Sequence, residues 1–197
     1  MDAFLASLSM VTLAEMGDKT QLLSFVLAAR FAGRHWAIIA GIFLATVANH
    51  FIAAFCGGWI ASLVNVSVLR IVLGIAFLGF AVWALIPDKL DDAKDDARSY
   101  GAFATALVMF FIAEMGDKTQ FATIAMGAKY ANVAAVTLGT TLGMMIANVP
   151  AVLIGERLAQ KFPISKMRFV AAALFAIFGV LVLLNADLGL TPTHLGS

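Results

Sequence analysis

The octapeptide AEMGDKTQ at residues 14–21 decides how this chain must fold, because it puts three charges inside an otherwise apolar segment. The same eight letters return at residues 113–120, again in an apolar segment. A charge at the centre of a transmembrane helix costs roughly 2.5–3.5 kcal/mol, so Glu15, Asp18 and Lys19 together cost on the order of 7–10 kcal/mol. The ten Leu, Ile, Val and Phe residues of segment 3–28 return only about 3–6 kcal/mol. The charges must therefore face the protein interior or a water-filled cavity.

The composition is that of an integral membrane protein built from helices. Of the 197 residues, 62% are hydrophobic and 13% are charged, and the mean hydropathy is +0.96. A soluble domain of this length needs more polar surface, and the apolar runs are too long for barrel strands and do not alternate. The net charge of +1 and the lack of a basic tail give no indication of a nucleic-acid partner.

Six apolar segments are long enough to cross a bilayer as helices. The first and fourth contain the octapeptide at an offset of 99 residues, and Ala48-Asn49 recurs at the same offset as Ala147-Asn148. We therefore expect an all-α polytopic membrane protein with two three-helix repeats. Repeats with an odd number of spans insert in opposite orientations, so the repeats are expected to be inverted. The expected spans are about 3–28, 36–60, 68–86, 101–127, 132–155 and 168–186.

The distribution of basic residues predicts the orientation in the membrane. The loops and flanks after the first, third and fifth spans carry nine Lys and Arg residues, and the opposite side carries two. Cytoplasmic loops are enriched in these residues, so both termini are expected outside the cytoplasm. The expected organisation is a first repeat at 1–86, an acidic cytoplasmic linker at 87–100 and a second repeat at 101–190. The linker is interpreted as a solvated tether, with a cation-gathering or regulatory loop as the alternative.

The spacing inside the octapeptide places its charges together. On a continuous helix, positions i, i+3 and i+4 share one face, so the Glu, Asp and Lys of each copy would line the same cavity. The glycine of each copy, Gly17 or Gly116, would lie opposite. There it would either let a neighbouring helix approach closely or let the helix unwind and offer carbonyl oxygens.

Two carboxylates from each inverted copy would form a cluster of hard oxygen ligands near the membrane midplane. Such a cluster suits Mn²⁺, Ca²⁺ or Mg²⁺, and the His and Cys spacing of zinc sites is absent. Four carboxylates and two lysines sum to a formal charge of −2, which one divalent ion or two protons would neutralise. Exchange of protons for a cation at one site is the minimum machinery of an antiporter. The alternative is that buried ion pairs merely lock the helices together. The predicted metal ligands are Glu15, Asp18, Glu114 and Asp117, with Lys19 and Lys118 balancing charge.

Other side chains near the acids are secondary candidates. The Thr and Gln residues of each copy offer oxygen atoms if the helix breaks, and the paired Asn residues either join helices or support the ligands. A thioether in each copy would favour a softer ion such as Mn²⁺ over Ca²⁺. His50 has Val149 as its counterpart and is interpreted as a packing or proton-relay accessory. The secondary candidates are Thr20, Gln21, Thr119, Gln120, Asn49, Asn148, Met16 and Met115.

The twin motif E-x-G-D-[KR]-[ST], present as EMGDKT at 15–20 and 114–119, resembles a family of cation/proton exchangers. That family includes bacterial manganese exporters of the MneA type and Golgi manganese/calcium transporters of eukaryotes. The resemblance covers nearly the whole chain. It implies that the four acids bind metal and protons, and that Mn²⁺, with Ca²⁺ next, leaves the cytoplasm in exchange for protons. It further implies a prokaryotic inner membrane, no prosthetic group and no enzymatic activity.

Two other functions stay open on the sequence alone. An intramembrane aspartyl protease also uses two membrane aspartates, one of them in a G-x-G-D setting, but here Glu15 stands where that motif has its first Gly. An exporter of small organic cations or amino acids would also place acids in the membrane. That function would require an aromatic or roomy pocket beside them, and the motif faces offer little of one.

Overall fold

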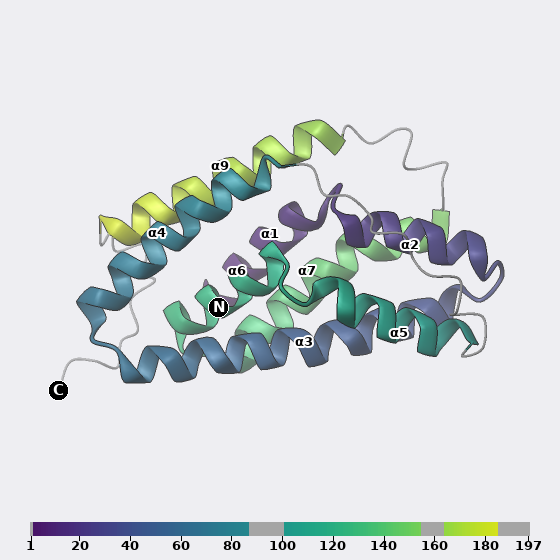
Figure 1. Ribbon diagram of the computed structural model, residues 1–197, viewed down its shortest axis with the longest axis horizontal. Coiled ribbons are helices and arrows are strands. Elements are labelled where there is room, and N and C mark those ends of the chain that lie inside the picture. The colour runs from purple at the N-terminus through teal and green to yellow at the C-terminus, as the bar shows by residue number, and fades with distance from the viewer. Residues whose placement is uncertain (1, 87–100, 155–163, 185–197) are drawn as a thin grey trace.

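The computed structural model describes residues 2–86, 101–154 and 164–184, and over these ranges the chain is helical (Figure 1). The expected all-α class is confirmed. The linker at 87–100 and the end of the sixth span beyond residue 184 lie outside the described residues. The helices are α1 (Asp2–Glu15), α2 (Lys19–Arg30), α3 (His35–Leu63), α4 (Val66–Ala84), α5 (Gly101–Glu114), α6 (Lys118–Tyr130), α7 (Val133–Ile154) and α9 (Ile164–Leu183).

Both octapeptides interrupt a helix. The first expected span consists of α1 and α2, and the fourth consists of α5 and α6. Gly17 and Gly116 take positive φ values of 86° and 75°, the left-handed conformation that ends helices and that glycine adopts at little cost. Asp18 and Asp117 then adopt extended backbone conformations as N-caps of the following helices. The prediction of one continuous helix through each motif is therefore wrong, and the alternative of an unwound helix is confirmed.

The helices of the two sequence halves pack across each other in matching pairs. Helix α1 packs on α7 and α5 packs on α3, while α2 contacts α7 and α6 contacts α3. Helices α4 and α9 pack together and run side by side as an outer layer in Figure 1. The broken helix α1–α2 thus packs against α7, which follows the second octapeptide. The broken helix α5–α6 packs against α3, which follows the first.

Glycines bring the paired helices into backbone contact. A Cβ added at Gly41 of α3 would lie 2.5 Å from the carbonyl oxygen of Phe103 in α5. A Cβ added at Gly139 of α7 would lie 2.5 Å from the carbonyl oxygen of Phe4 in α1. Phe4 and Phe103 are themselves 99 residues apart, the offset of the octapeptides. Close approach through small residues, the usual means of joining membrane helices, therefore occurs in both halves.

We expect Gly57→Ala to destabilise the fold, because a Cβ at this position would lie 2.0 Å from the carbonyl oxygen of Ile124 in α6. Overpacking of this kind costs about 1–3 kcal/mol. The next residue supplies the control, since a Cβ at Gly58 meets its nearest neighbour, a Val133 methyl group, at 3.7 Å. Thermal unfolding in detergent should show a clear fall in Tm for Gly57→Ala and little change for Gly58→Ala. Equal Tm values would show that the α3–α6 contact is looser than described.

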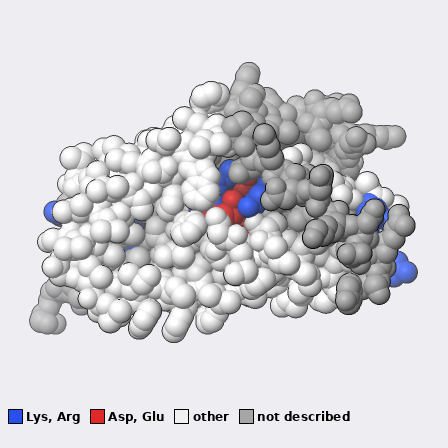
Figure 2. All heavy atoms as spheres, in the orientation of Figure 1, with Lys and Arg blue, Asp and Glu red and all other residues white. Residues whose placement is uncertain are grey.

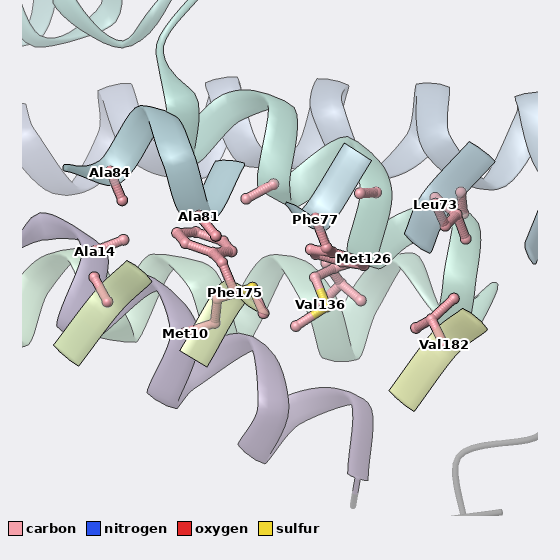
Figure 3. Close-up of a cluster of buried hydrophobic side chains, with 14 of the residues drawn as sticks. Met10, Ala14, Leu73, Phe77, Ala81, Ala84, Met126, Val136, Phe175 and Val182 are labelled. Carbon is pink, nitrogen blue, oxygen red and sulfur yellow. The ribbon is translucent and has the colours of Figure 1, made fainter. Parts of the chain in front are cut away.

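Two apolar clusters hold the bundle together. One joins α1, α4, α6, α7 and α9 through side chains such as Met10, Phe77, Met126 and Phe175 (Figure 3). The other joins α2, α3, α5 and α7 through residues that include Leu27, Ile42, Phe110 and Val152. Residues of different clusters flank each octapeptide break, Ala14 and Leu23 around the first and Phe110 and Ala122 around the second.

The outer surface of the helices is apolar. Helices α3, α4 and α7 are long and apolar enough to cross a membrane, while α5 and the stretch 169–183 are shorter apolar helices. Trp36 and Trp59, both exposed, stand 23 residues apart near the two ends of α3. At 1.5 Å per residue they are separated by about 35 Å, close to the roughly 30 Å thickness of a bilayer core. Tryptophans at that spacing suit the two membrane–water interfaces.

Candidate functional site

All four acids of the octapeptides are buried where the helices break. Glu15 and Glu114 are the last residues of α1 and α5, and Asp18 and Asp117 precede α2 and α6. None of the four is more than 2% exposed. Two helix C-termini, with partial negative charge, and two helix N-termini, with partial positive charge, therefore meet at the cluster.

Three of the four acids approach closely enough to share one ion. One oxygen each from Glu15, Glu114 and Asp117 lies within 4.8 Å of the others. Oxygen ligands at about 2.1–2.4 Å from a metal are separated by at most roughly 4.8 Å, so this triad has the dimensions of a coordination site. The structure does not bring Asp18 into the triad. One of its oxygens lies 3.0 Å from Lys118 Nζ.

The lysines pair with the aspartates of the opposite octapeptide. Lys19 Nζ lies 3.2 Å from Asp117 Oδ1, and Lys118 Nζ lies 3.0 Å from Asp18 Oδ1. Lysine and aspartate are neighbours in the sequence of each copy, yet each lysine reaches across to the other half. This exchange ties α2 to α6. It also leaves the two glutamates as the acids that have no lysine within ion-pair distance among the described residues.

The two glutamates have different neighbours. Glu15 accepts hydrogen bonds from the hydroxyl groups of both Thr20 and Thr119. Glu114 Oε1 lies 3.5 Å from Nε2 of His50, a fully buried side chain of α3. Within the described ranges, Glu114 Oε2 and Asp117 Oδ2 are buried without a hydrogen-bond partner. Because unsatisfied buried carboxylate oxygens are costly, a cation or a proton is the expected partner for them.

Two glutamines bridge the breaks and join the halves. Gln21 Oε1 accepts a hydrogen bond from the backbone N–H of Gly17 at 2.9 Å, and Gln120 Oε1 accepts one from Gly116 at 2.7 Å. The other end of each side chain crosses to the opposite half. Gln21 Nε2 donates to the Ala147 carbonyl oxygen, and Gln120 Nε2 donates to Asn49 Oδ1. Both amides therefore fix the unwound turns against α7 and α3.

The site opens toward one face of the molecule. Figure 2 shows acidic and basic side chains together in a hollow near the middle of a largely uncharged surface. Of the charged residues that the octapeptides contribute, Lys19 is the most exposed, with 24% of its side chain accessible.

The family to which the chain belongs is settled by a family model for the divalent cation/proton antiporter GDT1. It matches residues 3–92 and 102–189, nearly the whole chain in two stretches. The chain belongs to the GDT1 family. The family resemblance expected from the twin motif is thereby confirmed. A GDT1 protein is a divalent-cation transporter of the membrane and not an enzyme, so the protease alternative and the organic-cation alternative are both wrong.

Individual GDT1 relatives cover most of the chain. It is 48% identical over 181 residues to the "Putative manganese exporter" of Vibrio cholerae, covering 91% of this chain and 90% of that protein. It is 29% identical to GDT1-like protein 3 of Oryza sativa subsp. indica, covering 91% of this chain and 72% of the relative. It is 27% identical to a GDT1-like protein of Synechocystis, covering 90% and 95% of the two chains. No match was found among solved structures.

The secondary candidates fall into two groups in this GDT1 chain. Asn49 donates to the Phe111 carbonyl oxygen and accepts from Gln120, and Asn148 accepts a hydrogen bond from Ser24 Oγ at 2.8 Å. Both asparagines thus join helices of different halves. Met115 is 58% exposed and is not brought into the buried acid cluster, while Met16 is half-buried. The positions of the methionines therefore give no support to a thioether ligand at residue 115.

Ser24 is a site residue that the sequence reasoning missed. It is fully buried, and its hydroxyl connects α2 to Asn148 of α7. A signal for it exists in the repeat, because Thr123 stands at the octapeptide offset of 99 and is also a buried hydroxyl residue. Extending the comparison of the two copies one helical turn beyond Gln21 would have found this pair.

Proposed function

We propose that this chain exports a divalent cation, Mn²⁺ first and Ca²⁺ next, from the cytoplasm in exchange for protons. The observation that carries the proposal is the buried triad of Glu15, Glu114 and Asp117 at the meeting point of two broken helices, in a GDT1 antiporter. Manganese is supported by the printed name of the Vibrio cholerae relative, which is 48% identical. The same bacterial relative supports a location in a prokaryotic inner membrane.

We propose six spans arranged as two inverted repeats, with both termini outside the cytoplasm. Support comes from the matched cross-packing of α1 on α7 and α5 on α3, and from the reciprocal lysine–aspartate pairs. In Figure 1 the α2–α3 turn and the first residues of α5 and α9 lie toward one end of the molecule, and the α3–α4 turn lies toward the other. Basic residues such as Arg30 and Arg34 belong to the first end, which is the expectation for the cytoplasmic side.

The proposed exchange uses different acids for different tasks. Asp18 and Asp117 are each held by a lysine, so the pair of glutamates is available to alternate between cation and protons. The Thr20 and Thr119 hydroxyls steady the Glu15 carboxylate in the ion-binding geometry. With both lysines charged, the four carboxylates leave a formal charge of −2. One divalent ion or two protons restore neutrality, which favours binding of one or the other and disfavours an empty site in the low-dielectric interior.

Purified protein in proteoliposomes tests this proposal directly. With an imposed pH gradient, we expect Mn²⁺ to move opposite to the protons, with Ca²⁺, Mg²⁺ and Zn²⁺ as competitors of graded strength. Internal metal and internal pH are followed with separate dyes, and added metal should partly collapse the gradient. Metal flux that continues unchanged without a pH gradient or a membrane voltage, and without proton counterflow, would contradict exchange and indicate a facilitator.

A further inference from the structure

One histidine breaks the symmetry of the acid cluster. His50 of α3 is fully buried, and its Nε2 lies 3.5 Å from Glu114 Oε1. The corresponding residue of the other half is Val149, whose side chain has no polar atom. Around the glutamates, the asymmetry continues. Both threonine hydroxyls bond to Glu15, whereas an imidazole nitrogen stands beside Glu114.

We propose that His50 is a ligand of the transported ion through Nε2, next to Glu114, and that this nitrogen gives the site its preference for Mn²⁺ over Ca²⁺ and Mg²⁺. The inference rests on the proposed function and names the residue that sets the ion preference of the same site. It replaces the interpretation of His50 as an accessory.

The geometry of the pair agrees with ligation of one ion. Two ligands about 2.2 Å from a metal and roughly 90–105° apart are separated by roughly 3.1–3.5 Å. The Nε2–Oε1 distance is 3.5 Å, longer than an ordinary hydrogen bond between these atoms, which has a length near 2.9 Å. The two atoms are thus spaced as neighbouring ligands more closely than as a donor and its acceptor.

Packing alone does not account for this histidine. The Nδ1 atom of His50 is buried without a hydrogen-bond partner within the part of the chain that the structure describes. Leaving a buried polar atom unsatisfied costs about 1–3 kcal/mol, and Val149 shows that an apolar side chain suffices at the matching place. Because burying this imidazole is costly, we infer that its nitrogen atom has a role beyond packing.

The chemistry of the donor atoms indicates that this role is discrimination between metal ions. Carboxylate oxygens bind Ca²⁺, Mg²⁺ and Mn²⁺ alike, so the acids alone separate these ions only by cavity size. Imidazole nitrogen is a softer donor that transition metals accept and that Ca²⁺ and Mg²⁺ bind poorly. Of the two octapeptide thioethers, Met115 has 58% of its surface exposed and Met16 is half-buried. His50 is fully buried, and its Nε2 is the softer donor that the described residues place 3.5 Å from an oxygen of the triad.

Electron spin echo measurements on the Mn²⁺-loaded full chain test the ligand directly. We expect nitrogen modulation from a directly bound imidazole, and we expect it to change when the protein is labelled with ¹⁵N-histidine. The nitrogen modulation should vanish in His50→Val, which introduces the residue found at the corresponding position 149. It should persist in the control variant His35→Gln, at the start of α3. Bound Mn²⁺ without histidine coupling in the wild-type chain would overturn the inference, whatever the variant does.

Ion selectivity provides the second test. In proteoliposomes, His50→Val should lose Mn²⁺ exchange far more than Ca²⁺ exchange. The Mn²⁺/Ca²⁺ preference should fall by at least about 10-fold, the lower limit for groups that only support metal ligands. An unchanged preference in a transporting His50→Val protein would overturn the role of His50 and leave the proposed exchange standing. A wild-type chain that neither binds nor exchanges Mn²⁺ or Ca²⁺ would instead overturn the proposed function itself.

Discussion

Replacing Glu15 or Glu114 with Gln is expected to abolish cation exchange while leaving the protein folded in the membrane. Both side chains are buried at the ends of half-helices, and each contributes an oxygen to the triad. The amide keeps the size of the carboxyl group but removes the charge that would attract a divalent ion and hold protons. Since changes of groups that merely support metal ligands cost 10–100-fold, we expect a loss of at least about 100-fold here. Initial rates of Mn²⁺ flux under a fixed pH gradient measure it.

The matched control for these changes is Asp2→Asn, which alters an exposed acid at the start of α1, away from the cluster. It should leave flux unchanged. Glu15→Gln should also weaken the hydrogen bonds from Thr20 and Thr119, because an amide oxygen is a weaker acceptor than a carboxylate. If both Gln variants transported Mn²⁺ at the wild-type rate, the carboxylates would be structural and the proposed site would be wrong.

Lys118→Met is expected to lower the stability of the folded protein much more than Lys19→Met. Lys118 has 3% of its side chain exposed and contacts the fully buried Asp18, whereas Lys19 retains 24% exposure. Removing one partner of a buried ion pair costs about 3–5 kcal/mol, while partly exposed pairs are worth less because water screens them. Thermal unfolding in detergent and the amount of folded protein in the membrane report the difference.

A double variant separates loss of charge balance from loss of packing. Adding Asp18→Asn to Lys118→Met removes both charges of the pair, and Asn still serves as an N-cap for α2. We expect Tm to recover most of its loss, because neutral replacement of a buried pair is often tolerated. A double variant as unstable as Lys118→Met alone would mean that the lysine acts through other contacts.

The octapeptide predicted that its acids are buried together inside the protein, because charges exposed to lipid are costly. It also predicted the broken helix as one of two alternatives for Gly17 and Gly116. The choice between close packing and unwinding depended on backbone φ values, which the letters do not contain. Glycine suits either, so only the positions of the neighbouring helices decide.

The partners inside the site were not predictable from spacing. Lys19 is the neighbour of Asp18 in sequence, yet it pairs with Asp117. That pairing depends on how α2 and α6 meet, which is a tertiary property. The same holds for His50, whose contact with Glu114 joins residues 64 positions apart. Nothing in the segment 36–60 marks one polar residue as facing the acids and another as facing a neighbouring helix.

The crossed lysine–aspartate pairs also bear on how such a chain can be built during synthesis. Neither half can neutralise its own buried charges in the observed way, since each supplies the counter-ion of the other. When only the first half has been synthesised, its octapeptide charges lack the ion-pair partners that the second half supplies. We therefore expect these charges to stay hydrated, and the broken helix to stay unpacked, until the second half is made. The last folding step is then the docking of two electrostatically incomplete pieces. If the two halves are expressed as separate polypeptides, each should accumulate in the membrane only when both are produced in the same cell.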